Sequence, residues 1–246
     1  MLESVAITDV GKKRSLNQDY IYTTREKIGS LPNVFIVADG MGGHNGGEVA
    51  SQWTVQTILD EIIDTKAKTT KKIFEQAIQS SNKVIRNKAF ENPELYGMGT
   101  TVVVATINGA TLQVANVGDS RLYLIKPKKK VIRQITKDHS LVEEMVRRGS
   151  MAKEAAHKHP SKHIITRAVG ARDNIQIDFF SEKLSVGDLI LLCSDGLSDM
   201  LDDNEISDIL FSEKDIETQA NELINAANEN GGLDNITVVL IKYLSK

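Results

Sequence analysis

Aspartates beside or near glycine and asparagine recur in separated fragments of this chain, each next to a run of apolar residues. The fragments are residues 14–19 (RSLNQD), 39–44 (DGMGGH), 194–196 (SDG) and 231–237 (GGLDNIT). Carboxylates at strand ends, in tight glycine turns, are suitable ligands for Mg²⁺ or Mn²⁺, because these hard cations prefer oxygen. A single Asp-Gly pair indicates only a turn. The ordered set predicts an enzyme that uses divalent cations.

The composition is that of an ordinary globular protein and limits the classes of function. The chain has 246 residues, 41% of them hydrophobic and 26% charged, and a formal net charge of −3, which gives no indication of nucleic-acid binding. The single cysteine, Cys193, excludes an internal disulfide, suits a reducing compartment and lies in an apolar run, so we interpret it as a buried hydrophobic residue. The sequence has no membrane segment and no signal-peptide core, so we expect a cytoplasmic protein.

Short apolar runs alternate with longer segments of helical spacing. Strands are predicted at 5–7, 34–38, 100–105, 111–116, 121–125, 175–180, 188–193 and 236–243, and helices at 47–64, 70–90, 203–211 and 215–228. The short links at 108–109 and 118–119 predict antiparallel hairpins between the strands that they join. Residues 139–167 are polar and rich in Lys, His and Glu. We therefore expect one α+β layered domain over 1–246, with an inserted polar lobe.

The metal-site fragments, together with residues 99–101 (GTT) and 118–121 (GDSR), resemble the metal-dependent protein Ser/Thr phosphatases, the PPM or type 2C family. The resemblance is to the compact bacterial form, in which residues 138–140 (DHS) open a flap and residues 166–170 (TRAVG) close it. It extends from Thr8 to Thr237 with the motifs in family order. It implies a four-layer α-β-β-α sandwich, with two central antiparallel sheets flanked by helix pairs, a metal cleft at one end and a polar flap at about 139–167.

The resemblance also implies a set of metal ligands. Asp39 matches the aspartate that bridges two ions, the backbone carbonyl of Gly40 matches a second ligand, and Asp195 and Asp234 complete the set. Two Mn²⁺ or Mg²⁺ ions about 4 Å apart lower the pKa of a bridging water. The resulting hydroxide attacks phosphorus directly, so that no covalent enzyme intermediate forms.

Other residues match positions around these ligands. Arg14 matches the arginine that binds the substrate phosphate, which suits the guanidinium fork. His44 matches the histidine that protonates the leaving seryl or threonyl oxygen. Asp19 and Asn235 match residues behind the ligands, where Asp19 orients metal-bound water.

Asp119 and the flap each leave two interpretations open. Asp119 either caps the turn in which it lies or, with Asp195, binds a third and weaker ion. The basic flap residues, Arg147 and Arg148 among them, either attract an anionic phosphopeptide or keep the lobe soluble. For the flap histidines, including His163, we favour a solvated surface.

The resemblance implies a protein phosphatase that hydrolyses phosphoserine and phosphothreonine and reverses a bacterial Hanks-type Ser/Thr kinase. We expect a monomer without a nucleic-acid partner. One alternative is an inactive relative that serves as a binding module, although none of Asp39, Asp195 and Asp234 is missing. Another is a regulatory relative that dephosphorylates an anti-sigma antagonist. Phosphatase assays with metal address the first alternative, and a preference between phosphopeptides and whole phosphoproteins addresses the second.

Overall fold

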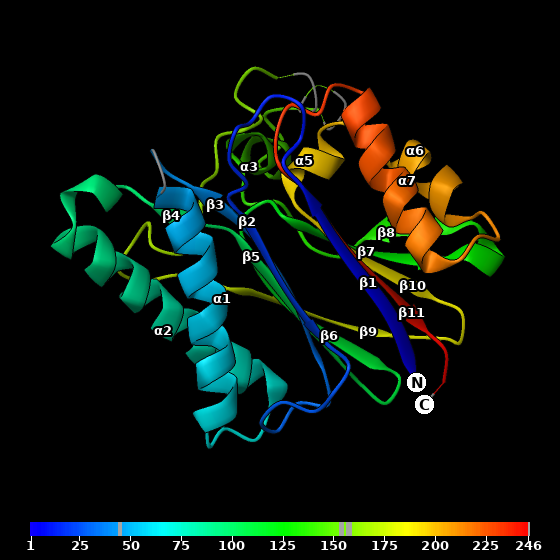
Figure 1. Cartoon of the computed structure of the whole chain (residues 1–246), viewed down its shortest axis with the longest axis horizontal. Helices are drawn as coiled ribbons and strands as arrows, with labels where there is room; N and C mark the ends of the chain where they lie inside the picture. Colours follow the sequence, from blue (N-terminus) through cyan, green and yellow to red (C-terminus); the bar gives the residue numbers. More distant parts are fainter. Residues whose placement is uncertain (44–45, 153–154, 156–158, 246) are drawn as a thin grey trace.

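Two antiparallel β-sheets pack face to face in the computed structural model of the chain (Figure 1). The structure describes residues 1–43, 46–152, 155 and 159–245. The first sheet has the order β1 (Leu2–Asp9), β11 (Ile236–Tyr243), β10 (Leu189–Cys193), β7 (Arg121–Lys126) and β8 (Val131–Gln134). The second has the order β2 (Asp19–Thr24), β3 (Val34–Met41), β5 (Val102–Asn108), β6 (Thr111–Val117) and β9 (Asp178–Lys183), with β4 (Gly99–Thr100) beside β3.

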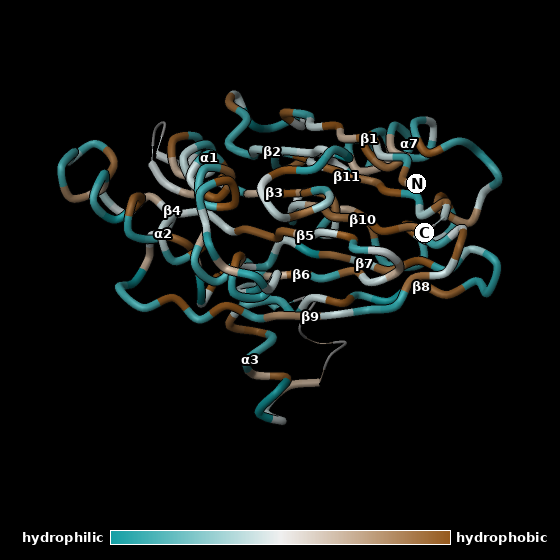
Figure 2. The backbone as a smooth tube through the Cα atoms, turned by 90° about the horizontal axis from the view of Figure 1, so that it is seen from below, coloured by the Kyte–Doolittle hydropathy of each residue, from teal (hydrophilic) through white to brown (hydrophobic). Residues whose placement is uncertain are grey.

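Helices cover the outer face of each sheet. The second sheet is covered by α1 (Gly46–Asp64) and α2 (Thr70–Glu91), and the first by α5 (Asp195–Ser198), α6 (Asp203–Leu210) and α7 (Ile216–Glu229). The short 3₁₀ helices are η1 (Pro93–Leu95) and η2 (Pro127–Lys129). The flap contains α3 (Leu141–Arg147), which stands away from the layers in Figure 2. This is the predicted α+β sandwich.

The strands form separate cores because their side chains alternate between the two faces of each sheet. On β3, Val34 and Ile36 pack under α1 and α2, whereas Phe35 and Val37 pack between the sheets. On β10 the same alternation sends Cys193 under the helices of the first sheet, where it is fully buried. Burial raises the pKa of its thiol to about 12, as expected for a structural cysteine.

The predicted hairpin at 108–109 is confirmed, but the one at 118–119 is wrong. β5 pairs with β6 in antiparallel register, whereas β6 and β7 belong to different sheets. Gly118 has φ +106° in the link between them, and a Cβ there would lie 2.6 Å from the side chain of Thr101. Both strands are buried on both faces, so their apolar pattern does not reveal which sheet each one joins.

Two further observations concern the helices. Trp53 of α1 is exposed, and the Nζ of Lys88 of α2 lies 3.5 Å from the centroid of its ring. Within the described parts of the chain, no helix has both the length and the apolar character needed to cross a membrane.

Candidate active site

The aspartates of the motifs meet at one end of the two sheets. Asp19, the first residue of β2, pairs in register with Asp39 of β3. Asp195 begins α5 directly after β10, and Asp234 lies just before β11, the neighbour of β10. Asp39 and Asp195 lie close enough for their carboxyl groups to interact. The structure thus brings together the aspartates of separated sequence fragments in one carboxylate cluster.

Burial and mutual repulsion make these carboxyl groups weak acids. Burial raises the pKa of Asp39 well above its ordinary value, and the charges of Asp19, Asp195, Asp119 and Asp234 raise it further. The same causes, with burial the larger, raise the pKa of Asp19 to about 7 and that of Asp195 to about 6. Carboxylates this close are stable only when protons or cations neutralise them. The cluster therefore has the chemistry of a divalent cation site.

Glycine is required where β3 meets the start of α1. A Cβ on Gly40 would lie 2.0 Å from the carbonyl oxygen of Gly47, and a Cβ on Gly47 would lie 2.6 Å from the carbonyl oxygen of Gly40. The backbone NH of Gly40 donates to the carbonyl of Gln18 over 3.1 Å. This close approach fixes the backbone of Gly40 beside the carboxylate of Asp39.

Hydroxyl and amide groups hold the cluster from behind. Ser194 and Thr237 donate their hydroxyls to Oδ2 of Asp19 over 2.7 and 2.6 Å. Asn235 accepts from the NH of Gln18 at 2.8 Å and donates to the carbonyls of residues 10 and 16 at 3.0 and 2.9 Å. Asp19 and Asn235 were predicted from the sequence, whereas Ser194 and Thr237 were not, although both lie in the motif fragments.

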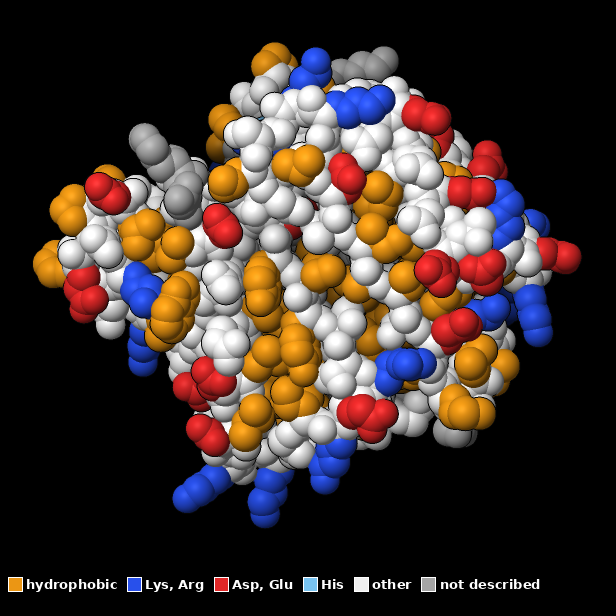
Figure 3. Space-filling model, viewed as in Figure 1, with side chains coloured by type: hydrophobic (Ala, Val, Ile, Leu, Met, Phe, Trp, Pro, Cys, Tyr) orange, Lys and Arg blue, Asp and Glu red, His pale blue; other side chains and the backbone are white. Residues whose placement is uncertain are grey.

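The loop after β1 places Arg14 at the mouth of the cluster. This loop packs closely on the segment before β11, because a Cβ on Gly11 would lie 2.1 Å from the carbonyl oxygen of Asp234. The guanidinium of Arg14 is exposed and lies 2.7 Å from Oδ2 of Asp234. Lys12 and Lys13 are also exposed, and Figure 3 shows Lys and Arg side chains at this end of the molecule.

Asp119 lies beside the cluster and is 7% exposed. Burial raises its pKa well above the ordinary value, and the charges of Asp195 and Asp138 add to this effect. Oδ1 of Asp119 and Oδ1 of Asp195 are buried without a hydrogen-bond partner among the described residues. Arg121, two residues on, forms an ion pair of 2.7 Å with Asp138. Asp119 therefore has an oxygen available for a ligand.

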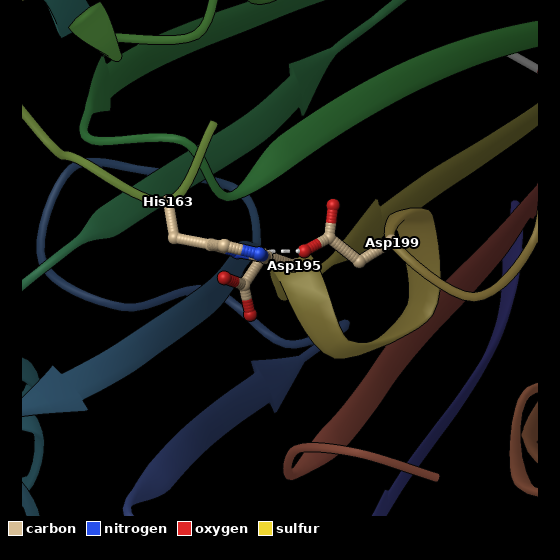
Figure 4. Close-up of side chains that lie close together, drawn as sticks. All are labelled: His163, Asp195 and Asp199. Atoms are coloured by element: carbon tan, nitrogen blue, oxygen red, sulfur yellow. Dashed lines mark ion pairs between the residues drawn. The ribbon is translucent and has the colours of Figure 1, made fainter. Parts of the chain in front are cut away.

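A cavity of about 240 Å³ separates the flap from Asp119 and Asp195. His163 and Asp199 also line it, and their side chains meet Asp195 in Figure 4, with donor atoms of all three within 4.8 Å of one another. Asp199 accepts ion pairs of 3.1 Å from both Lys162 and His163. Asp199, the partner of the exposed His163 side chain, was not predicted from the sequence. The one signal for it is that Asp199 follows Asp195 by about one helical turn.

Of the remaining predicted residues, two lie apart from the cluster and one lies outside the residues that the structure describes. Arg147 and Arg148 are exposed on the flap, where Arg148 pairs with Glu144 at 3.4 Å, and neither is among the described residues that line the cavity. His44 lies outside the described residues.

Comparisons with known proteins agree with this geometry. Residues 11–237 match the family model of protein phosphatase 2C. The serine/threonine phosphatase stp of Listeria innocua is 41% identical over 241 residues, which cover 96% of this chain and 93% of that protein. The solved structure of the S. agalactiae serine/threonine phosphatase is 36% identical, covers 100% of both chains and has a TM-score of 0.91. A solved catalytic domain of the phosphatase PstP, in complex with 2 manganese ions, is 33% identical, covers 99% of both chains and has a TM-score of 0.85.

Proposed function

Because the chain belongs to the protein phosphatase 2C family and is a protein serine/threonine phosphatase, we propose that the carboxylate cluster is its catalytic centre. Phosphoserine and phosphothreonine of protein substrates are hydrolysed there. The observation that carries this proposal is the burial of Asp19, Asp39 and Asp195 side by side with raised pKa values.

Asp39, Asp195 and Asp234, with the carbonyl of Gly40, are the proposed ligands for two Mn²⁺ or Mg²⁺ ions. The buried, mutually repelling oxygens of the cluster fit these cations, which prefer carboxylate and carbonyl ligands. Ions bound there would lower the pKa of a water and so supply a hydroxide nucleophile for phosphorus. Asp119, with its unpartnered Oδ1, is the proposed ligand of a third ion together with Asp195.

The side chains around the ligands have separate roles in the proposal. Arg14, which already reaches Asp234, binds two phosphate oxygens of the substrate through its guanidinium fork. Asp19 orients water, since Ser194 and Thr237 fix one of its oxygens. Asn235 holds the loop that carries Arg14. His44 donates a proton to the departing seryl or threonyl oxygen.

We further propose that the chain acts as a single-domain cytoplasmic monomer and reverses the action of a Hanks-type Ser/Thr kinase. Arg147 and Arg148 on the flap are proposed to attract acidic phosphopeptides, because both side chains are exposed.

The first test is hydrolysis of a phosphothreonine peptide by the full chain with Mn²⁺, with Mg²⁺ and with EDTA. We expect turnover with either ion and none with EDTA, because the cluster needs cations to work. Folded protein that is inactive with every ion contradicts the proposed centre and favours the binding-module alternative. Efficient hydrolysis of one whole phosphoprotein with poor peptide turnover favours the regulatory alternative.

A further inference from the structure

His139 is a buried histidine, 3% exposed, directly against the turn that carries Asp119. Its Nδ1 accepts a hydrogen bond of 3.0 Å from the backbone NH of Gly118. Its own backbone NH donates to the carbonyl of Gly118, also over 3.0 Å. His139 therefore contacts both polar groups of Gly118, the residue before Asp119.

The contacts of the ring define its protonation state. Because Nδ1 accepts a hydrogen bond, the proton of the neutral ring is on Nε2. Nε2 lies 3.2 Å from Oδ2 of Asp178. The guanidinium of Arg167 lies 3.0 Å from Oδ1 of Asp178 and 3.2 Å from Nε2 of His139. Burial lowers the pKa of His139, which agrees with a neutral ring that donates to Asp178.

The backbone of His139 also belongs to the base of the flap. Its carbonyl accepts from the NH of Thr166 over 2.7 Å, and the NH of Leu141 donates to the carbonyl of Ile164 over 2.8 Å. Ser140 and Ile165 form a β-bridge between these bonds. The two ends of the flap thus form a short antiparallel stem, and His139 is the residue of that stem that contacts the Asp119 turn.

The opposite side of the turn is held by Thr101, which lies between β4 and β5. The hydroxyls of Thr101 and Ser120 are hydrogen-bonded at 2.7 Å, and Oγ1 of Thr101 accepts from the NH of Asp39 at 3.0 Å. Gly118 has a positive φ that other residues adopt only with strain. The turn is therefore fixed between the backbone of Asp39 and the ring of His139.

We propose that His139 is a positioning residue that fixes Gly118 to the flap stem and thereby sets the carboxylate of Asp119 for a divalent cation. This inference rests on the cation site proposed at Asp119. The hydrogen bond between the NH of Gly118 and Nδ1 of His139 fixes the position of the Asp119 carboxylate, whereas the contact of His139 with Asp178 does not.

Two substitutions separate the two bonds of the ring. In His139→Asn, the amide oxygen can take the place of Nδ1 and accept from Gly118, while the contact with Asp178 is lost. In His139→Gln, the longer side chain can place its amide near the position of Nε2 and contact Asp178. No atom then replaces Nδ1 as the acceptor for the NH of Gly118. Mn²⁺ binding is measured by calorimetry on the full chain. The part of the binding heat that is present in the wild type and absent in Asp119→Ala is assigned to the Asp119 site. Thermal melting shows whether each variant is folded.

We expect His139→Gln to weaken Mn²⁺ binding at the Asp119 site about tenfold, the size typical for groups behind metal ligands, and His139→Asn to bind as the wild type does. Wild-type affinity in His139→Gln, or equal losses in both variants, overturns the inference. If His139→Gln does not fold, His139→Asn decides: wild-type affinity supports the role and a tenfold loss overturns it. A wild-type protein without any heat that depends on Asp119 contradicts the cation site itself, and this role with it.

Discussion

Buried hydrogen bonds hold one side of the carboxylate cluster, whereas ion pairs open to solvent contribute much of the other. The Asn235 side comprises Asp19, Ser194, Asn235 and Thr237, and the flap rim comprises Lys162, His163 and Asp199. Ser194 and Thr237 are fully buried, while the side chain of His163 is 61% exposed. Exposed pairs are weak and screened by salt, whereas buried hydrogen bonds are costly to break. We therefore expect substitutions on the Asn235 side to affect both stability and turnover, and those on the flap rim to affect mainly substrate and weak-ion binding.

The largest effect is expected where the two sides meet, at Asp39. Asp39→Asn removes the central carboxylate, so we expect turnover of a phosphothreonine peptide to fall at least about 1,000-fold. The melting temperature of the metal-free protein should stay the same or rise, because a buried repelling charge is removed. Kinetics with Mn²⁺ and melting with EDTA measure the two effects.

Asp60→Asn is the matched control, since it makes the same chemical change on the exposed face of α1, where Asp60 contacts only Gln56 among the described hydrogen bonds. It should behave as the wild type in both assays. Turnover above about one tenth of wild type in Asp39→Asn contradicts the central role of Asp39.

The next effect tests the Asn235 side alone. Asn235→Ala removes three hydrogen bonds to partly buried backbone groups, so we expect a loss of about 1–3 kcal/mol in the free energy of unfolding. Turnover should fall about 10- to 100-fold, because the loop that carries Arg14 loses its attachment. Urea unfolding and steady-state kinetics measure these changes. Asn221→Ala, on the exposed face of α7, is the control and should change neither; wild-type turnover in Asn235→Ala would show that Arg14 is held by other contacts.

The sequence predicted the structure best at the aspartates that lie at the ends of strands. Asp39, Asp195 and Asp234 could be selected from the sequence because each follows or precedes a run of apolar residues next to glycine or asparagine, and the structure brings them together. The order of strand-like and helical segments predicted the layered α+β class, and the resemblance to the phosphatase family implied the sandwich; the structure confirms both. The crossing between sheets after Gly118 was not predicted, because strands buried on both faces lack the alternation that identifies a sheet face. The partners of Asp19 and Asp199 were missed because they depend on contacts between distant segments.

A smaller and measurable effect is the pH dependence of the metal-free protein. In the folded state the pKa of Asp19 is raised to about 7 and that of Asp195 to about 6, above the values in the unfolded chain. The folded state therefore binds protons more tightly, and this stabilisation is present at low pH and lost as pH rises through 6 to 7. Between pH 6 and pH 8 we expect a loss of about 2 kcal/mol, or roughly 4–8 °C in melting temperature.

Saturating Mn²⁺ is the control for this measurement, because bound cations replace the protons. The melting temperature in Mn²⁺ should not fall between pH 6 and pH 8. A metal-free protein that is equally stable at both pH values would mean that the cluster is less buried or less repulsive than its geometry indicates.

The smallest effect is expected at the flap rim. Asp199→Asn removes the charge that pairs with Lys162 and His163, both partly exposed, so the cost in stability should stay below about 1 kcal/mol. Because Asp199 lines the cavity between flap and cluster, we expect KM for a phosphopeptide to rise about two- to fivefold, with kcat nearly unchanged. Kinetics at low and high salt measure this, and the difference from wild type should shrink at high salt. Glu222→Gln is the control, because Glu222 lies on α7 and forms an ion pair with Lys214 at the surface. This substitution should leave KM unchanged. A loss of kcat as large as that of Asp39→Asn would place Asp199 among the cation ligands and remove the distinction between the two sides.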